Sequence, residues 1–273
     1  MRRNRTLVSV LAIVVALLFL FPTYWMVSTA LTPAGDITTS KYNLVPNGFT
    51  FQHFIDAVSR HNFGTYLRNS VFVTIAALVF AMVVGLLAAV PLSRLRFRGR
   101  KGFMLLILIA QLAPFEALLV PYYLFMRHFE LDTSLTALIL IYFIFTLPFT
   151  VWTLRGFIDG IPEDLEEAAM VDGCSKWSAF WRVTFPLLGP GLVATSVYAF
   201  ITAWNEFLYA FVFLQDNSKY TLPVWLSTFQ TAFGTDWGGT MAASTLFTIP
   251  VLVFFLIVQR NLVAGITAGA VKG

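Results

Sequence analysis

The most distinctive chemical feature of this sequence is a group of carboxylates gathered in one short stretch. Six of the fourteen acidic residues lie between Asp159 and Asp172, in a chain that is 58% hydrophobic. The stretch reads Ile-Pro-Glu-Asp-Leu-Glu-Glu-Ala-Ala-Met-Val-Asp-Gly over 161–173, and Val-Thr-Phe-Pro follows at 183–186. A polar segment between two apolar stretches needs a role outside the lipid. We interpret it as a docking element for a soluble partner.

The side chains within this acidic stretch favour contact with another protein. Ala168 and Ala169 are small, so a partner could pack closely there, while Glu166 and Glu167 offer charge to a basic surface. The alternative is an amphipathic helix at the membrane surface that only connects two spans. An acidic helix is poorly suited to that position, because the anionic cytoplasmic leaflet attracts Lys and Arg. Protein docking is therefore the favoured interpretation.

Local signals predict that the acidic stretch forms a helical hairpin. Pro162 suits a first helical position, and the carboxylates that follow meet the positive end of the helix dipole. Gly173 suits a left-handed C-terminal stop. Ser175 can cap a second short helix, which Pro186 ends. We therefore expect a helix–turn–helix across the membrane surface within the loop 156–188.

Composition places the whole chain in a membrane. Only 12% of its residues are charged, about half the fraction of a soluble domain, and the mean hydropathy is +0.77. The basic residues sit at the ends of apolar runs and not on a soluble face, so nucleic-acid binding is not expected. The single cysteine, Cys174, excludes an intrachain disulfide. The three histidines form no metal-ligand spacing, so no metal site is expected.

Six apolar stretches are long enough to cross a membrane, which takes about 20 residues of helix. They cover 7–31, 69–92, 103–126, 135–155, 189–214 and 240–260. They lack the alternation of β-barrel strands. The first stretch follows three arginines, so a cleaved secretory signal is the alternative. It is longer than a signal's apolar core and lacks a clear cleavage site, so we interpret it as a retained span.

The basic residues predict the orientation of the six spans. Thirteen lysines and arginines lie on the side of the N-terminus and five lie opposite, counting all 18. Cytoplasmic loops carry the excess of such residues. Both termini, the loop 94–101 and the acidic stretch are therefore expected in the cytoplasm.

The spacing of the acidic stretch resembles a known family motif. Glu167-Ala168-Ala169, three residues, Gly173, nine residues and then Val-Thr-Phe-Pro at 183–186 is similar to the EAA motif of importer permeases in ATP-binding-cassette (ABC) transporters. That motif ends in Ile-x-Leu-Pro, so Val183 and Phe185 are conservative departures. Cys174 stands where Ala is usual.

Other segments extend this resemblance over nearly the whole chain. They are similar to segments of carbohydrate permeases of the maltose-permease (MalG) type and comprise 20–28, 69–70, 93–100, 131–133, 147–149, 154–157, 204–207 and 265–273. Thr32 and Pro91 depart from that pattern. The resemblance implies an all-α integral membrane protein, a single permease domain over 1–273, with six transmembrane helices, a cytoplasmic coupling helix and the architecture of type I ABC importers.

The resemblance also implies partners and site residues. Such a subunit pairs with a second, homologous permease, a dimer of ABC ATPases and an extracytoplasmic solute-binding protein in the plasma or inner membrane of a bacterium or archaeon. ATP and Mg would be bound by the ATPase, and no cofactor by this chain. The residues implied to couple with the ATPase are Glu166, Glu167, Ala168, Ala169, Asp172, Gly173 and Pro186. The cytoplasmic tail 261–273 would contact the ATPases through Thr267, Gly269 and Lys272.

Two carboxylates, Glu116 and Glu206, are predicted within the bilayer. A charge at the centre of a membrane helix costs about 2.5–3.5 kcal/mol, so these residues are expected to face a cavity or a partner. With Trp204 and Asn205, Glu206 could contact a sugar, because sugars stack on aromatic rings and hydrogen-bond to carboxylates and amides. The favoured interpretation of Glu206 is a buried hydrogen bond to the partner permease or a position near the outer surface. Prolines in several spans fit either simple tolerance or bent helices that line a cavity.

The resemblance implies that the chain is the permease subunit of an ATP-driven importer for an oligosaccharide, a disaccharide or a related polyol or glycerophospho compound. No Gly-x-x-x-x-Gly-Lys-Ser/Thr run occurs, so the chain has no phosphate-binding loop and is not itself an enzyme. The alternative is an ion- or proton-coupled transporter acting alone, with Glu116 and Glu206 as proton carriers. That alternative leaves the acidic stretch unexplained. An intramembrane enzyme is disfavoured, because the spans hold no nucleophile–base or metal set.

Overall fold

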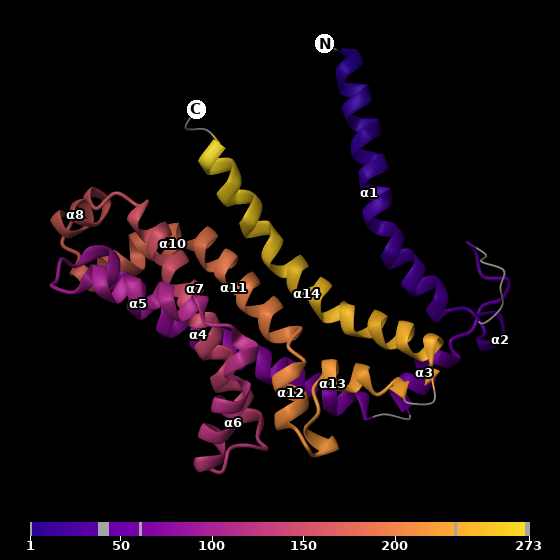
Figure 1. Ribbon diagram of the computed structural model, residues 1–273. Coiled ribbons are helices and arrows are strands. Elements are labelled where there is room, and N and C mark those ends of the chain that lie inside the picture. Colours follow the sequence, from indigo (N-terminus) through magenta and orange to yellow (C-terminus); the bar gives the residue numbers. More distant parts are fainter. Residues whose placement is uncertain (1, 38–43, 60–61, 232–233, 271–273) are drawn as a thin grey trace. The chain divides into compact units, whose positions relative to one another are not determined.

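The computed structural model describes residues 2–37, 44–59, 62–231 and 234–270 (Figure 1). The chain divides into two compact units. Unit 1 comprises Met1–Gly64 and Val224–Val251, and unit 2 comprises Thr65–Pro223 and Leu252–Gly273.

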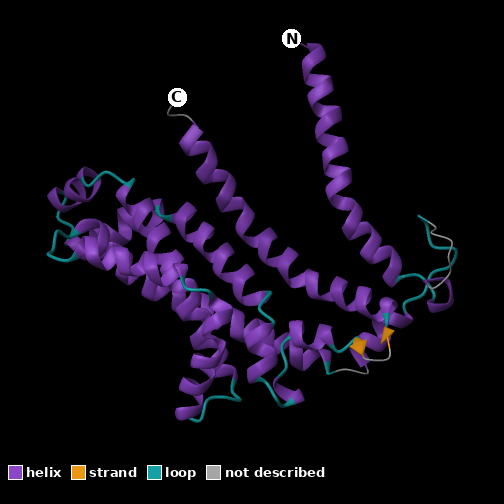
Figure 2. Cartoon of the chain, in the orientation of Figure 1, coloured by secondary structure: helices purple, strands orange, loops and turns teal. Residues whose placement is uncertain are grey.

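Helices make up nearly all of the described chain (Figure 2). The α-helices are α1 Arg2–Ala30, α2 Ala34–Ile37, α3 Gln52–Ser59, α4 Phe63–Arg94, α5 Arg100–Leu112, α6 Leu119–His128, α7 Leu135–Asp159, α8 Asp164–Val171, α9 Lys176–Ala179, α10 Phe185–Leu187, α11 Gly189–Trp204, α12 Leu208–Phe213, α13 Leu222–Ser227 and α14 Trp237–Ala270. Short 3₁₀ turns cover Phe115–Leu118 and Asn217–Lys219, and a π turn covers Phe180–Thr184. Two-residue strands, β1 Gln230–Thr231 and β2 Gly234–Thr235, pair antiparallel.

Four helical segments are long and apolar enough to cross a membrane unbroken. They are Leu7–Ala30, Phe63–Arg94, Leu135–Asp159 and Trp237–Gln259. Two further candidates are bent pairs, Arg100–Leu112 with Phe115–His128 at 89° and Lys176–Leu187 with Gly189–Trp204 at 68°. The described chain therefore offers up to six spans if each bent pair is one span. The span limits given above for the sequence remain a prediction.

The bend between α5 and α6 falls inside the stretch 103–126, which hydropathy alone treats as one span. Ala113 is extended (ψ 127°) and Pro114 follows it with ψ 114°. A residue before proline is pushed out of the helical region by the proline ring, so the helix ends there. Apolar content continues through this break, and hydropathy therefore does not reveal it.

Helix α7 lies at the centre of unit 2 and packs against α11, α5 and α12. Leu138, Ile141, Leu154 and Ile158 on it are fully buried. Gly85 of α4 shows how closely its neighbours approach, because a Cβ there would lie 2.6 Å from Cγ2 of Thr150. Small residues of this kind allow close packing between helices in lipid, where no hydrophobic driving force operates.

Unit 1 contains α1, α3 and the β hairpin. The apolar window of α1 has no residue buried against the rest of the chain. Its Tyr24 hydroxyl donates to the carbonyl of Leu44 at 2.5 Å, and Nε2 of His53 in α3 lies 3.0 Å from the carbonyl of Thr32. These contacts hold the short segments that follow α1.

Candidate functional site

The acidic stretch forms a short helix, α8, at one end of unit 2, whereas α6 and α12 lie at the other end (Figure 1). Glu163 occupies the N-cap position, and Asp164, Glu166 and Glu167 fill the first turn. Carboxylates there face the positive end of the helix dipole, as predicted. Pro162 lies one residue before the cap, not at the first helical position. Its carbonyl still accepts from the amide of Leu165 at 3.3 Å, so the turn begins at the proline.

Helix α8 ends at Val171, and Gly173, two residues later, adopts φ +89°. Its amide donates to Met170 O at 3.0 Å, and the amide of Cys174 donates to Ala169 O at 3.0 Å. This pair of bonds is a Schellman motif, which satisfies carbonyls that the helix end would leave open. The predicted left-handed stop is confirmed. An added Cβ would meet nothing within 4 Å, so a substitution here is opposed by backbone conformation and not by crowding.

The second half of the hairpin begins at Ser175, whose hydroxyl accepts from the amide of Ser178 at 3.2 Å and caps α9, as predicted. The expectation that Pro186 ends this helix is confirmed to within one residue. The helical run continues through the π turn and α10 to Leu187 and then bends into α11. The π turn closes with the amide of Phe185 on Phe180 O. Because Pro186 has no amide hydrogen, the widened turn just before it accommodates the missing bond.

An apolar contact anchors the hairpin to the membrane helices. Phe180 is buried in a cluster with Ile161 from the loop, Ala89 of α4, and Leu154 and Ile158 of α7. The hairpin therefore has a fixed base, and its outer turns extend from that base.

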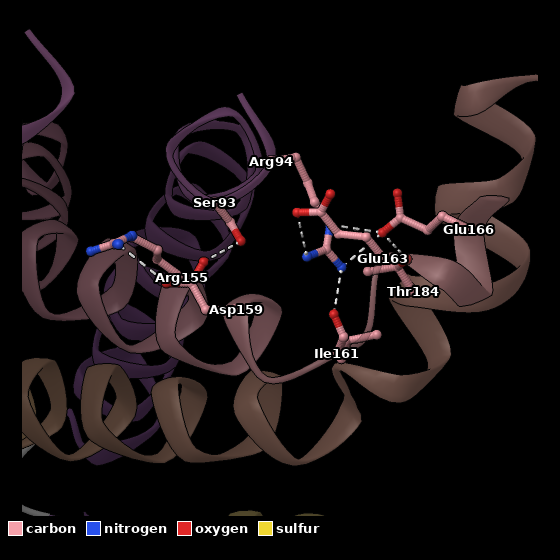
Figure 3. Close-up of polar contacts among 8 residues, drawn as sticks. All are labelled: Ser93, Arg94, Arg155, Asp159, Ile161, Glu163, Glu166 and Thr184. Carbon is pink, nitrogen blue, oxygen red and sulfur yellow. Dashed lines mark hydrogen bonds and ion pairs between the residues drawn. The ribbon is translucent and has the colours of Figure 1, made fainter. Parts of the chain in front are cut away.

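A polar network adds a second anchor, shown in Figure 3. Arg94, in the last turn of α4, places both Nε and Nη2 2.9 Å from Oε1 of Glu166 in α8. The hydroxyl of Thr184 in the π turn donates to the same oxygen at 2.6 Å. Nη2 of Arg94 also donates to Ile161 O at 3.1 Å. The guanidinium thus ties α4 to α8 and to the loop before it, and the carboxylate of Glu166 ties both to the π turn.

The ends of α4 and α7 are joined by a neighbouring contact. The Ser93 hydroxyl donates to Oδ1 of Asp159 at 2.5 Å, and Nη2 of Arg155 lies 3.2 Å from Oδ2 of the same carboxylate (Figure 3). Asp159 is the last residue of α7, and α8 begins five residues later. The ends of α4 and α7 beside the hairpin are therefore bonded to each other.

The two glutamates at the heart of the motif have different environments. The side chain of Glu166 is only 20% exposed and is bound by Arg94 and Thr184, whereas Glu167 is exposed. Ala168, Asp172 and Pro186 are also exposed, and Ala169 is half-buried. Two apolar side chains accompany the exposed set, Val171 at 88% and Trp177 at 65%.

Sequence reasoning missed the structural role of Glu166 and did not assign Arg94 or Thr184 to the site. Arg94 served only as a basic residue in the orientation count, and no local signal pairs it with a carboxylate 72 positions away. The sequence gives only a weak indication that Val171 and Trp177 are exposed. Both are apolar residues in a segment that is predicted to form a short hairpin outside the membrane spans.

The residues predicted along a solute path lie at breaks between helices. Glu116 is exposed in the 3₁₀ turn after α5, and Asn205 is exposed at the end of α11, where its amide donates to Ile201 O at 2.9 Å. Trp204 is buried. Trp204, Asn205 and Glu206 are consecutive and lie at the break between α11 and α12. Glu116 lies at the break between α5 and α6. Tyr209 links the two breaks, because its hydroxyl donates to Phe115 O at 2.7 Å.

Glu206 is held by hydrogen bonds within the chain. Its Oε2 accepts from the Tyr142 hydroxyl at 2.6 Å and from the amide of Ala210 at 3.2 Å, while Oε1 accepts from the amide of Tyr209 at 2.9 Å. The carboxylate therefore caps the start of α12 and fixes it to α7.

Two other groups of predictions can be placed on the structure. No group of three or more His, Cys, Asp or Glu residues that could hold a metal occurs in the described part of the chain. Within the predicted tail, the backbone of Thr267 and Gly269 continues α14, whereas their side-chain environments and all of Lys272 lie outside the described residues.

The fold and hairpin define a transmembrane permease subunit, and sequence comparison identifies its family. Residues 81–268 match the model of the binding-protein-dependent transport system inner membrane component. The match covers more than half of the chain, and the protein belongs to this family. It is therefore a multi-pass inner-membrane permease component of an ABC transporter, whose ATPase is a separate subunit.

Named transport permeases match this chain over almost their full length. The diacetylchitobiose uptake system permease protein DasC of Streptomyces coelicolor is 47% identical, over 97% of this chain and 96% of that protein. The trehalose transport system permease protein SugB of Mycobacterium tuberculosis is 35% identical, over 99% of each. The trehalose/maltose transport system permease protein MalG of Thermococcus litoralis is 34% identical, over 99% and 98%.

A solved structure supports the fold. A chain of a bacterial ABC transporter involved in the import of the acidic polysaccharide alginate superposes with a TM-score of 0.80 at 23% identity, over 95% of this chain and 96% of that chain. The predicted all-helical ABC importer permease fold is confirmed.

Proposed function

We propose that this chain is the permease subunit of a sugar importer that moves a disaccharide or short oligosaccharide through alternating access. The solutes that the names of DasC, SugB and MalG give are all small saccharides, which supports this class of solute. The observation that carries the coupling part of the proposal is the division between Glu166, bound inside the chain, and Glu167, exposed beside Val171 and Trp177.

The complete transporter would contain this chain, a second homologous permease, two ABC ATPase subunits and an extracytoplasmic solute-binding protein. ATP and Mg would be held by the ATPases. The excess of basic residues on the N-terminal side supports an orientation with both termini and the α8 hairpin in the cytoplasm. The tail around Thr267, Gly269 and Lys272 would reach the ATPases from the same side.

The α8 hairpin is proposed to seat on the ATPase through its outer face. Glu167 would meet a basic residue, Ala168 and Ala169 would allow close approach, and Val171 with Trp177 would supply apolar contact. Asp172, Gly173 and Pro186 hold the shape of the hairpin that presents this face. ATP binding can drive the permease only if this contact is stronger in one permease conformation than in the other.

Within the permease, the proposed transmission follows the two polar anchors. A displaced α8 pulls Arg94 through Glu166, and therefore the end of α4. The adjacent bond between Ser93 and Asp159 passes the displacement to the end of α7. Glu116 and Asn205 are the proposed solute-facing groups at the helix breaks. Glu206 instead fixes the break beside Trp204.

The docking face can be tested by charge reversal at its exposed glutamate. Glu167→Lys and Gly173→Asp are expected to leave membrane insertion intact but to lower ATPase retention and ATP-driven uptake, because one reverses the contact charge and the other strains the φ +89° turn. The assays are co-purification of the ATPase with the complex and uptake into proteoliposomes. Glu130→Lys, an equal charge reversal at an exposed site opposite the hairpin in the proposed orientation, is the control for ATPase retention.

Normal ATPase retention and uptake in both variants would refute the docking face. Uptake by the purified chain alone in response to a proton gradient would instead refute the importer and favour an ion-coupled transporter.

A further inference from the structure

A groove with a volume of about 400 Å³ lies between the first turns of α5 and the last turns of α7. Three cationic residues, Arg100, Lys101 and Arg155, line it. The rest of its lining is apolar and includes Leu105, Leu108 and Trp152. We propose that this groove binds the phosphate headgroup of an anionic phospholipid, with the upper part of an acyl chain along the apolar wall.

The charges of the groove are not balanced within the chain. Asp159 lies 3.2 Å from Nη2 of Arg155, but it also accepts from Ser93. In the part of the chain that the structure describes, no carboxylate pairs with Arg100 or Lys101. The three cations and this one carboxylate leave a net charge of +2 at the groove. Figure 3 shows Arg155 extending to the opposite side of Asp159 from Ser93, and thus away from the Arg94 network.

Arg155 is also incompletely hydrogen-bonded. Its Nε is buried and has no acceptor among the described residues. A buried donor without a partner is costly, and native structures rarely leave one. Oxygens of a phosphate would provide the acceptor after a turn of the guanidinium, in the bidentate geometry that arginine favours.

The start of α5 is electrostatically unfavourable by itself. Arg100 and Lys101 are its first two residues, its N-cap is Gly99, and its first turn has no acidic residue. The N-terminus of a helix carries the positive end of the dipole, where cations are destabilising and anions are stabilising. An anion in the groove would offset both the helix end and the two side chains.

The groove changes from charged to apolar along its length. Leu108 lies about 12 Å along α5 from Arg100, at 1.5 Å per residue. Helix α7 runs through Trp152 to Arg155 before it ends at Asp159. Met104 and Ile107 pack on Val151 and hold the two helices together. A headgroup site at the charged end with a chain site beyond it matches the boundary between lipid headgroups and hydrocarbon.

The apolar wall favours a lipid over free phosphate. Leu105 is 59% exposed and Trp152 is 42% exposed within the chain. Soluble phosphate would leave these surfaces uncovered, whereas a phospholipid uses them together with the cations. Basic pockets between membrane helices on the cytoplasmic side are suited to anionic headgroups. The cytoplasmic location depends on the orientation proposed above, but the selectivity for an anion does not.

The test uses the full chain, purified in detergent alone and within its assembled transporter. Native mass spectrometry would measure the affinity for three probes: phosphatidylglycerol, phosphatidylcholine with the same chains, and inorganic phosphate. The variant Arg100→Gln with Lys101→Gln removes two cations of the groove. The matched control is Arg96→Gln with Arg98→Gln, which removes two exposed cations from the preceding loop without altering the groove lining.

Phosphatidylglycerol is expected to bind more tightly than either other probe. A basic residue near an anionic headgroup contributes about fivefold, so the groove variant should bind phosphatidylglycerol about 25-fold more weakly, or about 2 kcal/mol at 1.4 kcal/mol per tenfold. The control variant should retain most of its affinity for phosphatidylglycerol.

Several results would overturn the proposal. Equal binding of phosphatidylcholine would mean a purely apolar groove, and equal binding of phosphate would mean a site for a soluble anion. An equal loss of phosphatidylglycerol affinity in the groove variant and in the control variant would mean that the lipid responds to the overall positive charge and not to this groove. Loss of the bound lipid on assembly would mean that another subunit occupies the groove. None of these results bears on ATPase retention by the hairpin, so the proposed function is tested separately.

Discussion

The pair formed by Arg94 and Glu166 offers a quantitative test of how the hairpin is held. Their side chains are 14% and 20% exposed, and both Nε and Nη2 of Arg94 lie 2.9 Å from one carboxylate oxygen. A fully exposed pair contributes about 0–1 kcal/mol, whereas breaking a buried pair costs about 3–5 kcal/mol. With four-fifths or more of each side chain covered, and a further bond from Thr184, we expect a coupling energy of about 2 kcal/mol.

A double-mutant cycle measures this energy directly. The variants are Arg94→Gln, Glu166→Gln and both together, because glutamine keeps much of the shape and removes the charge. Each single substitution should lower the thermal stability of the purified transporter. The double variant should be no less stable than the worse single variant, because the second substitution removes the stranded charge left by the first.

Transport should respond in the same pattern. If the hairpin moves α4 through this pair, the pair holds the hairpin in its bound position relative to a detached one. Losing its coupling energy of about 2 kcal/mol then changes the ratio of these two positions about 25-fold, at 1.4 kcal/mol per tenfold. The measurement is the number of ATP molecules hydrolysed per solute imported, with ATPase retention measured in parallel. We expect wasteful hydrolysis with retention near normal. Strictly additive losses of stability, or an unchanged ratio of ATP to solute, would refute the role given to this pair.

Two further predictions concern packing and docking. Gly85→Ala should lower stability by about 1–3 kcal/mol through overpacking, because its Cβ would lie 2.6 Å from Cγ2 of Thr150. Adding Thr150→Ser removes that methyl group and should restore thermal stability. A double variant as unstable as Gly85→Ala would show that the clash is not the cause. Trp177→Ala should weaken ATPase binding tenfold or more in a titration of the membrane complex, since aromatic anchors at interfaces contribute about 2 kcal/mol or more. Trp237→Ala, at an indole of similar exposure in unit 1, is the control, and equal loss in both variants would contradict a docking role for Trp177.

Local chemistry made much of the hairpin predictable from the sequence. The left-handed stop at Gly173 and the cap at Ser175 depend on residues within one or two turns, and both were predicted correctly. The helical run ends at Leu187, one residue after Pro186, as expected. The π turn just before the proline was not expected, because a rule about single residues does not include it. The bend at Pro114 was missed because the apolar content that identifies a span continues through it.

Contacts between distant segments could not be predicted in the same way. In the sequence, Arg94 belongs to the basic stretch 94–101, whose residues all indicate the cytoplasmic side in the same way. Nothing nearby distinguishes Arg94 from Arg96 or Arg98. Only the packing of α4 against the hairpin selects Arg94 as the partner of Glu166. Likewise, Glu206 is an unexplained charge in an apolar stretch until α7 places Tyr142 beside it.

Asp159, Glu166 and Glu167 lie within nine residues and all carry a carboxylate, but their contacts differ and so do their roles. Asp159 accepts from Ser93 and pairs with Arg155, so it joins the ends of α4 and α7. Glu166 is enclosed by Arg94 and Thr184, so its charge is used within the permease. Within the described residues, Glu167 is the one carboxylate of the three whose side chain has no hydrogen bond or ion pair, and it is exposed. In the proposed docking, the motif that begins with Glu167 presents one charge to the ATPase, while the residue before it holds the helix that carries that charge.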